Sequence, residues 1–294
     1  IAPVHHRNLT LQKPAATSSG KRERIKIIGG IPQHSSPLII AGFHRSGTSL
    51  TANLFANAGL HLGEKLLGAM PSNPLGHFED TSVIAFHDKL LKQSGAFWQT
   101  EKPFLPVVTD EDWEWLREYG IKNSLYPAWG IKDPRVCLFL PQWAKTFPSM
   151  SVLYIFRPCV ECVHSIKRRA ARDLQNGVAQ MINQRFWTIE DLAIKMYIIY
   201  AKAALDFLDT FSGRSRVIPL HDLLTNDDIV HDVREHWGYS LGRAFIGDIY
   251  DKSFLSLTGP NEVVHDSALL EEVEEVEAKL LQRSELGFVD GASN

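Results

Sequence analysis

The sequence has 294 residues, of which 44% are hydrophobic and 22% charged, so the chain can bury a large core and is not disordered throughout. A formal net charge of −3 argues against a nucleic-acid partner, and three cysteines are too few for a disulfide framework. Because no apolar run reaches the ~18 residues that a membrane-spanning helix needs, we expect no membrane span in this sequence.

Residues 1–35 predict a flexible tail, because they mix Pro, Ser, His and Gly with a basic run at 21–24 and show no sustained period. The sequence begins with Ile1 rather than Met, which indicates processing, and an anchor upstream of it would not be visible. We therefore expect a cytoplasmic protein if the source is bacterial, and a Golgi luminal one if an N-terminal anchor has been removed.

The first regular element is predicted at residues 37–43, where a short apolar run ends in glycine. Such a run is typical of a strand that is buried on both faces. The polar residues 44–49 follow, and then an apolar-periodic segment that ends at Gly59. The pattern predicts a strand, a loop and a helix closed by glycine.

Strands and helices alternate along the rest of the chain, which predicts an α/β fold with a central, mainly parallel sheet flanked by helices in three layers. This domain is expected at residues 36–265, with a C-terminal helix and tail at 266–294. The predicted elements are a long loop at 60–80, helices at 81–94 and around 113–116, a strand at 128–131, a strand at 152–156, a helix starting at Pro158, a helix at 187–211, a strand at 216–220 and a helix at 269–281.

Residues 42–49 have the spacing GxxxxG followed by two hydroxyl residues, which predicts a P-loop-type fold. A nucleoside-triphosphatase loop has lysine after its second glycine, whereas this chain has Thr48 there and carries its cation at Arg45. Backbone N–H groups at a helix N-terminus and nearby hydroxyls can still hold phosphate oxygens, so we favour anion binding over a simple glycine turn. The predicted phosphate-binding residues are His44, Arg45, Ser46, Gly47, Thr48 and Ser49.

This loop resembles the 5′-phosphosulfate loop of sulfotransferases, which use 3′-phosphoadenosine 5′-phosphosulfate as co-substrate. A second segment resembles the 3′-phosphate site of the same family, because Arg157 ends a predicted strand and Ser165 follows eight residues later on the next helix. The resemblance covers about residues 37–225 and implies that both segments bind this co-substrate. Recognition of adenine stays open, because the tryptophan that cytosolic members place after the Thr-Ser pair is missing.

A third segment, the Lys-Asp-Pro string that starts at Lys132, resembles tyrosylprotein and bacterial carbohydrate sulfotransferases. In those enzymes this lysine points at the transferring sulfuryl group. The bacterial group also shares the strings found here at 76–80 and 132–137. The resemblance implies a sulfotransferase whose acceptor is the hydroxyl of a carbohydrate or glycoconjugate, ahead of a protein tyrosine.

Sulfuryl transfer needs cations where charge accumulates, and Arg45 and Lys132 are the candidates. We expect no metal, because arginine, lysine and a helix dipole can neutralise the leaving bisphosphate. Glu79 is our first choice as the catalytic base, with His77 and His44 as rivals since histidine is a good base near neutral pH. The alternative for Glu79 is a carboxylate that only stabilises the N-terminus of the following helix.

Two other classes remain in view: a P-loop small-molecule kinase and a non-catalytic nucleotide-binding scaffold. The kinase would need a lysine after Gly47 and a magnesium-binding aspartate, and neither is evident. The basic run at 167–172 is equally compatible with a solvated surface and with an anion site. We interpret Cys159 and Cys162 as an incidental pair, and a homodimer stays open.

Overall fold

The computed structural model describes residues 36–68, 76–226, 228–250 and 266–290, so the tail predicted at 1–35 lies outside the described part. In these residues, four strands form one sheet in the order β2-β1-β3-β4, and every neighbouring pair is parallel. The predicted α/β fold with a parallel central sheet is therefore confirmed. The strands are β1 (Leu38–Ala41), β2 (Gly130–Lys132), β3 (Ser151–Phe156) and β4 (Arg214–Pro219).

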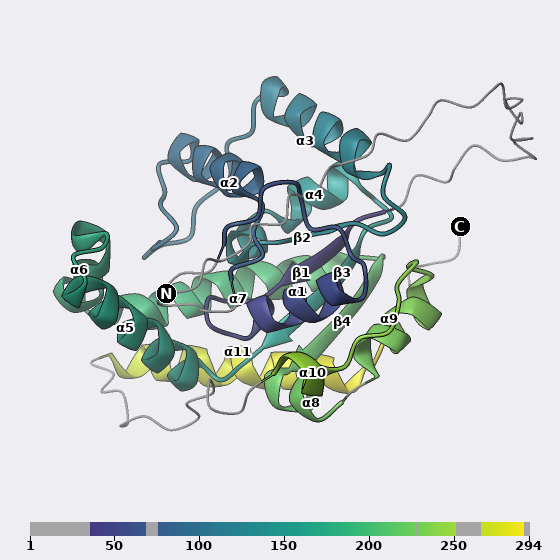
Figure 1. Ribbon diagram of the computed structural model, residues 1–294. Helices are drawn as coiled ribbons and strands as arrows, with labels where there is room; N and C mark the ends of the chain where they lie inside the picture. The colour runs from purple at the N-terminus through teal and green to yellow at the C-terminus, as the bar shows by residue number, and fades with distance from the viewer. Residues whose placement is uncertain (1–35, 69–75, 227, 251–265, 291–294) are drawn as a thin grey trace, which may run out of the picture. The chain divides into compact units, whose positions relative to one another are not determined.

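Helices lie between the strands in sequence and flank the sheet in space (Figure 1). The first half of the described chain contains α1 (Thr48–Asn57), α2 (Thr81–Gln93), α3 (Asp110–Asn123), the 3₁₀ helix η1 (Pro134–Leu138) and α4 (Leu140–Thr146). The second half contains α5 (Cys159–Gln175), α6 (Gln180–Thr188), α7 (Leu192–Thr210), α8 (Leu220–Thr225), α9 (Ile229–Trp237), α10 (Ile246–Ile249) and α11 (Ser267–Glu285).

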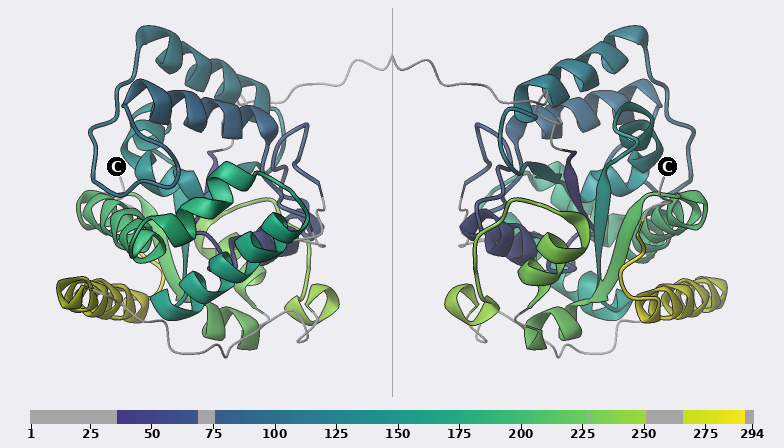
Figure 2. Two further views of the ribbon diagram at one scale, coloured as in Figure 1. Left: turned by 90° about the vertical axis from the view of Figure 1, so that its left-hand side faces the viewer. Right: turned by 90° about the vertical axis from the view of Figure 1, so that its right-hand side faces the viewer.

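Strands β1, β2 and β3 are buried along their whole length, as the apolar run at 37–43 predicts for the first of them, and β4 is partly buried. Alternate residues of a strand point to opposite faces, so Ile39 and Ala41 enter one apolar cluster while Leu38 and Ile40 enter another. The first cluster joins β1 to α2, α3, α4, α5 and α7, and the second joins it to α1, α8 and α9. Two helical layers therefore enclose the sheet. Helix α11 adds to the first layer by packing along α7 (Figure 2).

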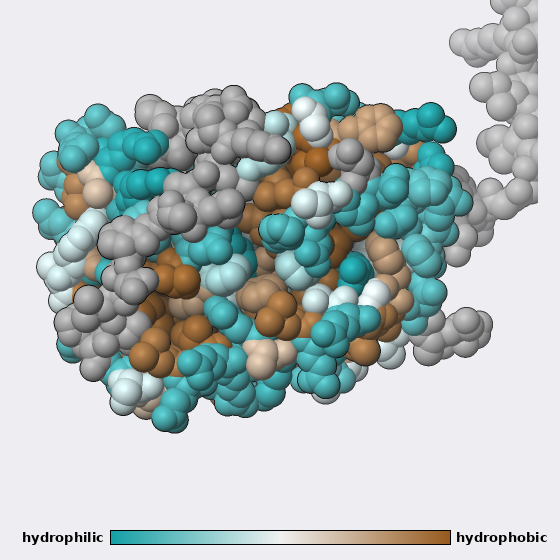
Figure 3. Space-filling model, turned by 90° about the horizontal axis from the view of Figure 1, so that it is seen from below, coloured by the Kyte–Doolittle hydropathy of each residue, from teal (hydrophilic) through white to brown (hydrophobic). Residues whose placement is uncertain are grey.

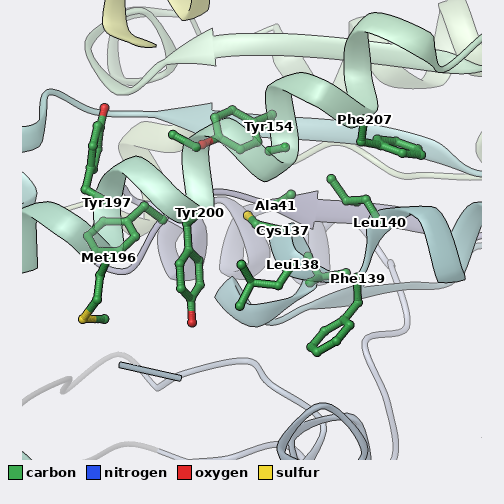
Figure 4. Packing of buried hydrophobic residues seen from close by; sticks show 14 of the residues in the cluster. Ala41, Cys137, Leu138, Phe139, Leu140, Tyr154, Met196, Tyr197, Tyr200 and Phe207 are labelled. Carbon is green, nitrogen blue, oxygen red and sulfur yellow. The ribbon is translucent and has the colours of Figure 1, made fainter. Parts of the chain in front are cut away.

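Helix α7 packs against η1, the segment that links β2 to α4, and Figure 4 shows Tyr200 beside Cys137 and Leu138 of that segment. The hydroxyl of Tyr197 donates a hydrogen bond to the backbone oxygen of Arg157 at 3.1 Å, and the hydroxyl of Tyr200 donates to that of Trp98 at 2.8 Å. The core thereby fixes the backbone at the end of β3. Figure 4 shows these rings with Ala41, Cys137, Leu138, Phe139, Leu140, Tyr154, Met196 and Phe207.

Most predicted elements match the observed ones within a few residues, but the long helix predicted at 187–211 begins five residues later, at Leu192. The chain ends α6 at Thr188 and starts α7 at Leu192. Asp191 adopts the left-handed conformation (φ 53°), which no helix interior accommodates. The predicted strand at 216–220 is also displaced, because β4 starts at Arg214 and Leu220 already belongs to α8.

The surface mixes hydrophobic with hydrophilic side chains on the face seen in Figure 3. Leu105 and Met181 are the most exposed large apolar residues of the described chain. Scattered apolar side chains of this kind are ordinary on a folded protein, so the homodimer stays a prediction. Among the described helices, none combines the length and the apolar character that crossing a membrane requires.

Candidate active site

The loop between β1 and α1 has the backbone shape that its glycines predict. Gly42 (φ 149°) lies so close to β3 that a Cβ atom would stand 2.4 Å from the backbone oxygen of Ile155. Gly47 (φ 103°) is the left-handed N-cap residue of α1, and no side chain caps this helix end. The first N–H groups of α1 therefore point out of the helix without a side-chain acceptor, which is the arrangement that binds phosphate oxygens.

Arg45 joins the two predicted phosphate-binding segments, although 120 residues separate it from Ser165. Its Nε donates a hydrogen bond to the Oγ of Ser165 at 3.0 Å. Its backbone oxygen accepts a hydrogen bond from Nη1 of Arg157 at 3.1 Å. The Nε of Arg157 in turn donates to Glu161 at 2.8 Å. Because β1 and β3 are neighbours in the sheet, the loop after β1 and the start of α5 meet at one edge.

Cations crowd this edge of the sheet. Burial, followed by repulsion from Arg169 and Arg157, lowers the pKa of Arg45 to about 10. Arg169 comes from the basic run that the sequence left undecided, and it lines the same cavity as Arg45. A bound anion would offset the positive charges that lower the pKa of Arg45.

Lys132 ends β2 and is almost fully buried, with 2% of its side chain exposed. Its Nζ donates hydrogen bonds to the Oγ of Ser49 (3.0 Å), to the backbone oxygen of His77 (3.1 Å) and to Oε1 of Glu79 (2.5 Å). The lysine thus links the first turn of α1 to the loop before α2. The predicted cation and the predicted base form one buried ion pair.

Glu79 is not the residue that caps α2. Asp80 is the N-cap, and its Oδ1 accepts the hydrogen bond from the backbone N–H of Ser82 at 2.8 Å. The carboxylate of Glu79 is directed instead to Lys132, and it lines the cavity. Its position therefore fits a role in the site better than one in stabilising the helix end.

His77 and His44, the rival bases, also line the cavity. Burial lowers the pKa of His77 to about 4, with Arg169 and Lys132 adding to the shift. Burial also lowers the pKa of His44 well below its ordinary value, and rings of Trp98 and Tyr200 pack around it. Both imidazoles are therefore neutral near pH 7.

Three buried polar atoms of the site have no hydrogen-bond partner among the described residues: Oγ of Ser46 and Nε2 of His44 and His77. Buried polar groups almost always find a partner in proteins, so such orphaned atoms indicate where a polar ligand binds. Together with the uncapped N-terminus of α1, they fit a phosphorylated ligand. Within the residues that the structure describes, no group of three His, Cys, Asp or Glu side chains could hold a metal ion.

One cavity gathers most of the residues predicted for the site, while Ser46 and Ser165 lie buried next to it. The sequence did not single out Leu220 or Tyr250. It drew attention to Pro134 only as part of the Lys-Asp-Pro string, and to Arg169 only as one member of a basic run. An apolar or aromatic residue carries no signal of its own until the fold brings it to the cavity. The cavity is lined by His44, Arg45, Gly47, Thr48, Ser49, Leu50, His77, Glu79, Lys132, Pro134, Arg157, Arg169, Leu220 and Tyr250.

The surroundings of Cys159 and Cys162 agree with the interpretation that their spacing is incidental. Cys159 and Cys162 are free and buried, and so is Cys137. Burial raises the pKa of the Cys162 thiol to about 12, which removes it from thiolate chemistry near neutral pH.

No protein-family model and no curated protein matches the chain. Among solved structures, it is similar to the sulfotransferase STF1 from Mycobacterium tuberculosis H37Rv, with 15% identity over 84% of this chain and 77% of that one and a TM-score of 0.43. A sulfotransferase from Alicyclobacillus acidocaldarius gives 14% identity, coverage of 85% and 94%, and a TM-score of 0.46. The sulfotransferase STF9 from Mycobacterium avium gives 15% identity over 89% of this chain and 79% of that one, with a TM-score of 0.42. Because these TM-scores are low, the case for a function comes from the site itself.

Proposed function

We propose that the protein is a sulfotransferase that moves a sulfuryl group from 3′-phosphoadenosine 5′-phosphosulfate to a hydroxyl of a carbohydrate or glycoconjugate. The observation that carries the proposal is the contact of Arg45 with Ser165 and Arg157. The two predicted anion-binding segments are distant in sequence but are joined by these contacts. This arrangement suits a donor that carries phosphate groups at both the 5′ and the 3′ position of its ribose. A nucleoside triphosphate has no second phosphate at the 3′ position.

The residues of the site divide the work of sulfuryl transfer. The N-terminus of α1, Ser46 and Thr48 bind the 5′ end of the donor, and Arg157 with Ser165 binds its 3′-phosphate. The donor, when bound, supplies the sulfuryl group and a bisphosphate leaving group. Lys132 and Arg45 stabilise the charge that accumulates in the transition state.

Glu79 acts as the general base in this proposal. It takes the proton of the acceptor hydroxyl while the new oxygen–sulfur bond forms, and the electron pair of the broken sulfur–oxygen bond leaves with the bisphosphate. An ionised carboxylate can accept this proton at neutral pH. His77 and His44 are neutral and could also accept one, although their lowered pKa values make them weaker bases than an ordinary histidine. We prefer Glu79 because its carboxylate lies against Lys132, the cation proposed for the transferring group.

Titration calorimetry tests the donor site. We expect 3′-phosphoadenosine 5′-phosphate to bind tightly without magnesium, and ATP to bind weakly. Ser165→Ala should weaken binding of the bisphosphate roughly tenfold or more, because a hydrogen bond to a charged group is lost. Adenosine 5′-phosphate is the matched control ligand, and its binding should not change in this variant. Preferential binding of ATP, or binding only with magnesium, would contradict the proposal and favour the kinase.

A labelled donor tests the reaction and the acceptor. The purified chain should transfer label to at least one member of a panel of glycans, and not to tyrosine peptides. Label on tyrosine peptides alone would move the acceptor to protein. Bisphosphate binding without transfer to any glycan, lipid or peptide would favour a nucleotide-binding scaffold.

A further inference from the structure

A buried polar network of Trp143, His87 and Asp133 supports Arg135, which lies next to Glu79. The side chains of His87 and Asp133 are fully buried, and Nδ1 of His87 lies 2.8 Å from Oδ2 of Asp133. Trp143, also fully buried, donates a hydrogen bond from Nε1 to Nε2 of His87 at 3.0 Å. An indole N–H is only a donor, so Nε2 of His87 is the acceptor and carries no proton. The proton therefore sits on Nδ1, and the neutral ring donates to Asp133.

Asp133, fixed by His87, in turn fixes the orientation of Arg135. Its Oδ1 accepts hydrogen bonds from the backbone N–H of Arg135 at 3.0 Å and from Nε of the same residue at 2.9 Å. Burial alone would raise the pKa of Asp133, but the charges of Arg135 and the hydrogen bond from His87 outweigh it and hold the pKa well below its ordinary value. The carboxylate is therefore ionised and fixed, and the guanidinium that it binds has one orientation.

That orientation brings Arg135 to the candidate base. The Nη2 of Arg135 lies 3.8 Å from Oε2 of Glu79, while Nη1 binds Asp88 at 2.7 Å. Lys132 holds the other carboxylate oxygen, Oε1, at 2.5 Å. Burial alone would lower the pKa of Arg135, but Asp133, Asp88 and Glu79 hold it above its ordinary value, so the guanidinium stays charged.

The two cations on Glu79 have different freedom. Lys132 is a flexible ammonium with three acceptors, and in the proposed reaction it must turn to the transferring group. The planar guanidinium of Arg135 is held by the carboxylates of Asp88 and Asp133, so it cannot turn toward the transferring group. When Lys132 leaves Oε1, Arg135 is the cation that remains in contact with Glu79.

We infer that Arg135 is a positioning residue, whose positive charge beside Oε2 keeps the carboxylate of Glu79 oriented while Lys132 serves the transferring group. The inference rests on the proposed function, because it assigns Arg135 a task in that reaction. The chain from Trp143 through His87 and Asp133 gives the guanidinium a rigid support from the core. Preorganised groups of this kind are what keeps a catalytic side chain within its productive geometry.

Kinetics of Arg135→Gln and Arg135→Lys test the inference. Without the cation, Glu79 takes up a proton more readily, so the acidic limb of the pH profile of kcat should move upward by about one pH unit or more in Arg135→Gln. The rate of Arg135→Gln should fall by up to about tenfold at pH values on the acidic limb and return to that of the parent on the plateau at higher pH, while KM for the donor changes little. Arg135→Lys keeps the charge and should move the limb less. A loss of kcat that is equal at every pH would show a merely structural role and overturn the inference.

Two further measurements keep the test independent of turnover. Infrared spectroscopy can follow the carboxylate band of Glu79, which is identified by its absence in Glu79→Gln. In the Lys132→Met background, adding Arg135→Gln should raise the pH at which this band appears, and an unchanged pH would overturn the inference. Calorimetry with the bisphosphate tests the proposed function separately. Arg117→Gln, which removes an arginine with 55% of its side chain exposed, is the surface control and should change neither profile nor band.

Discussion

Replacing Lys132 with methionine should lower both the stability and the activity of the protein. The change removes the cation from a pair whose side chains are only 2% and 8% exposed, and it breaks three hydrogen bonds. Leaving one charge of a buried pair uncompensated costs about 3–5 kcal/mol. Because Arg135 still lies 3.8 Å from Glu79, we expect a loss near 3 kcal/mol, toward the lower end of that range.

Urea unfolding of Lys132→Met, Glu79→Gln and the double variant forms the cycle that measures this pair. The double variant should lose at least about 2 kcal/mol less than the two single losses together, because it leaves no buried charge unpaired. All three should transfer sulfuryl groups at least about 100-fold more slowly, since stability restored in the double variant does not restore the chemistry. Bisphosphate binding should persist in each.

The exposed pair of Lys279 and Glu275 provides the control cycle. These side chains are 55% and 58% exposed, so their coupling should be too small to separate from the error of the measurement. If the losses at Lys132 and Glu79 add within about 0.5 kcal/mol, the pair is not energetically linked and the reasoning from burial fails. A Lys132→Met enzyme with unchanged turnover would remove this lysine from the mechanism.

Three further outcomes are expected. The pKa of His77 is about 4 in the folded protein against an ordinary 6.5, so the unfolded chain takes up the proton first as the pH falls and stability should be lost between these two values. The urea midpoint of His77→Gln should therefore decline less over this pH range, and an equal decline would contradict the assignment. Gly42→Ala should lower the thermal midpoint sharply, because its Cβ would stand 2.4 Å from the backbone oxygen of Ile155; an unchanged midpoint would contradict this close approach. Thiol reagents should label the folded protein slowly and the unfolded protein quickly, and rapid labelling in native buffer would contradict the burial of Cys137, Cys159 and Cys162.

The sequence predicted the parts of the site that depend on local chain chemistry. The loop after β1 was predictable, because glycine spacing and a following apolar period act over a few residues. Lys132 and Arg157 could be placed at strand ends for the same reason, and parallel strands bring their carboxyl ends to one edge of the sheet. The positions of Arg45 and Ser165 in the sequence also led us to assign them to the two phosphate-binding segments, and these roles stay predictions.

The sequence could not predict the parts that depend on packing between distant elements. His87 looks like any residue on an amphipathic helix, and only the fold places it against Asp133, 46 residues later. The approach of Arg135 to Glu79 arises in the same way, from how η1 packs beside the loop before α2. The break between α6 and α7 was missed because a left-handed Asp191 is a backbone choice that residue periodicity does not report.

The hydrogen bonds of Arg45 have a consequence for protein synthesis. This residue adopts the left-handed conformation (φ 68°), and the partners that hold its backbone oxygen and side chain lie 112 and 120 residues further along. Since translation proceeds from the N-terminus, a nascent chain carries the loop long before Arg157 and Ser165 leave the ribosome. The proposed donor site is thus complete only when β3 and α5 have been made, and a product truncated before them would keep the loop without these partners.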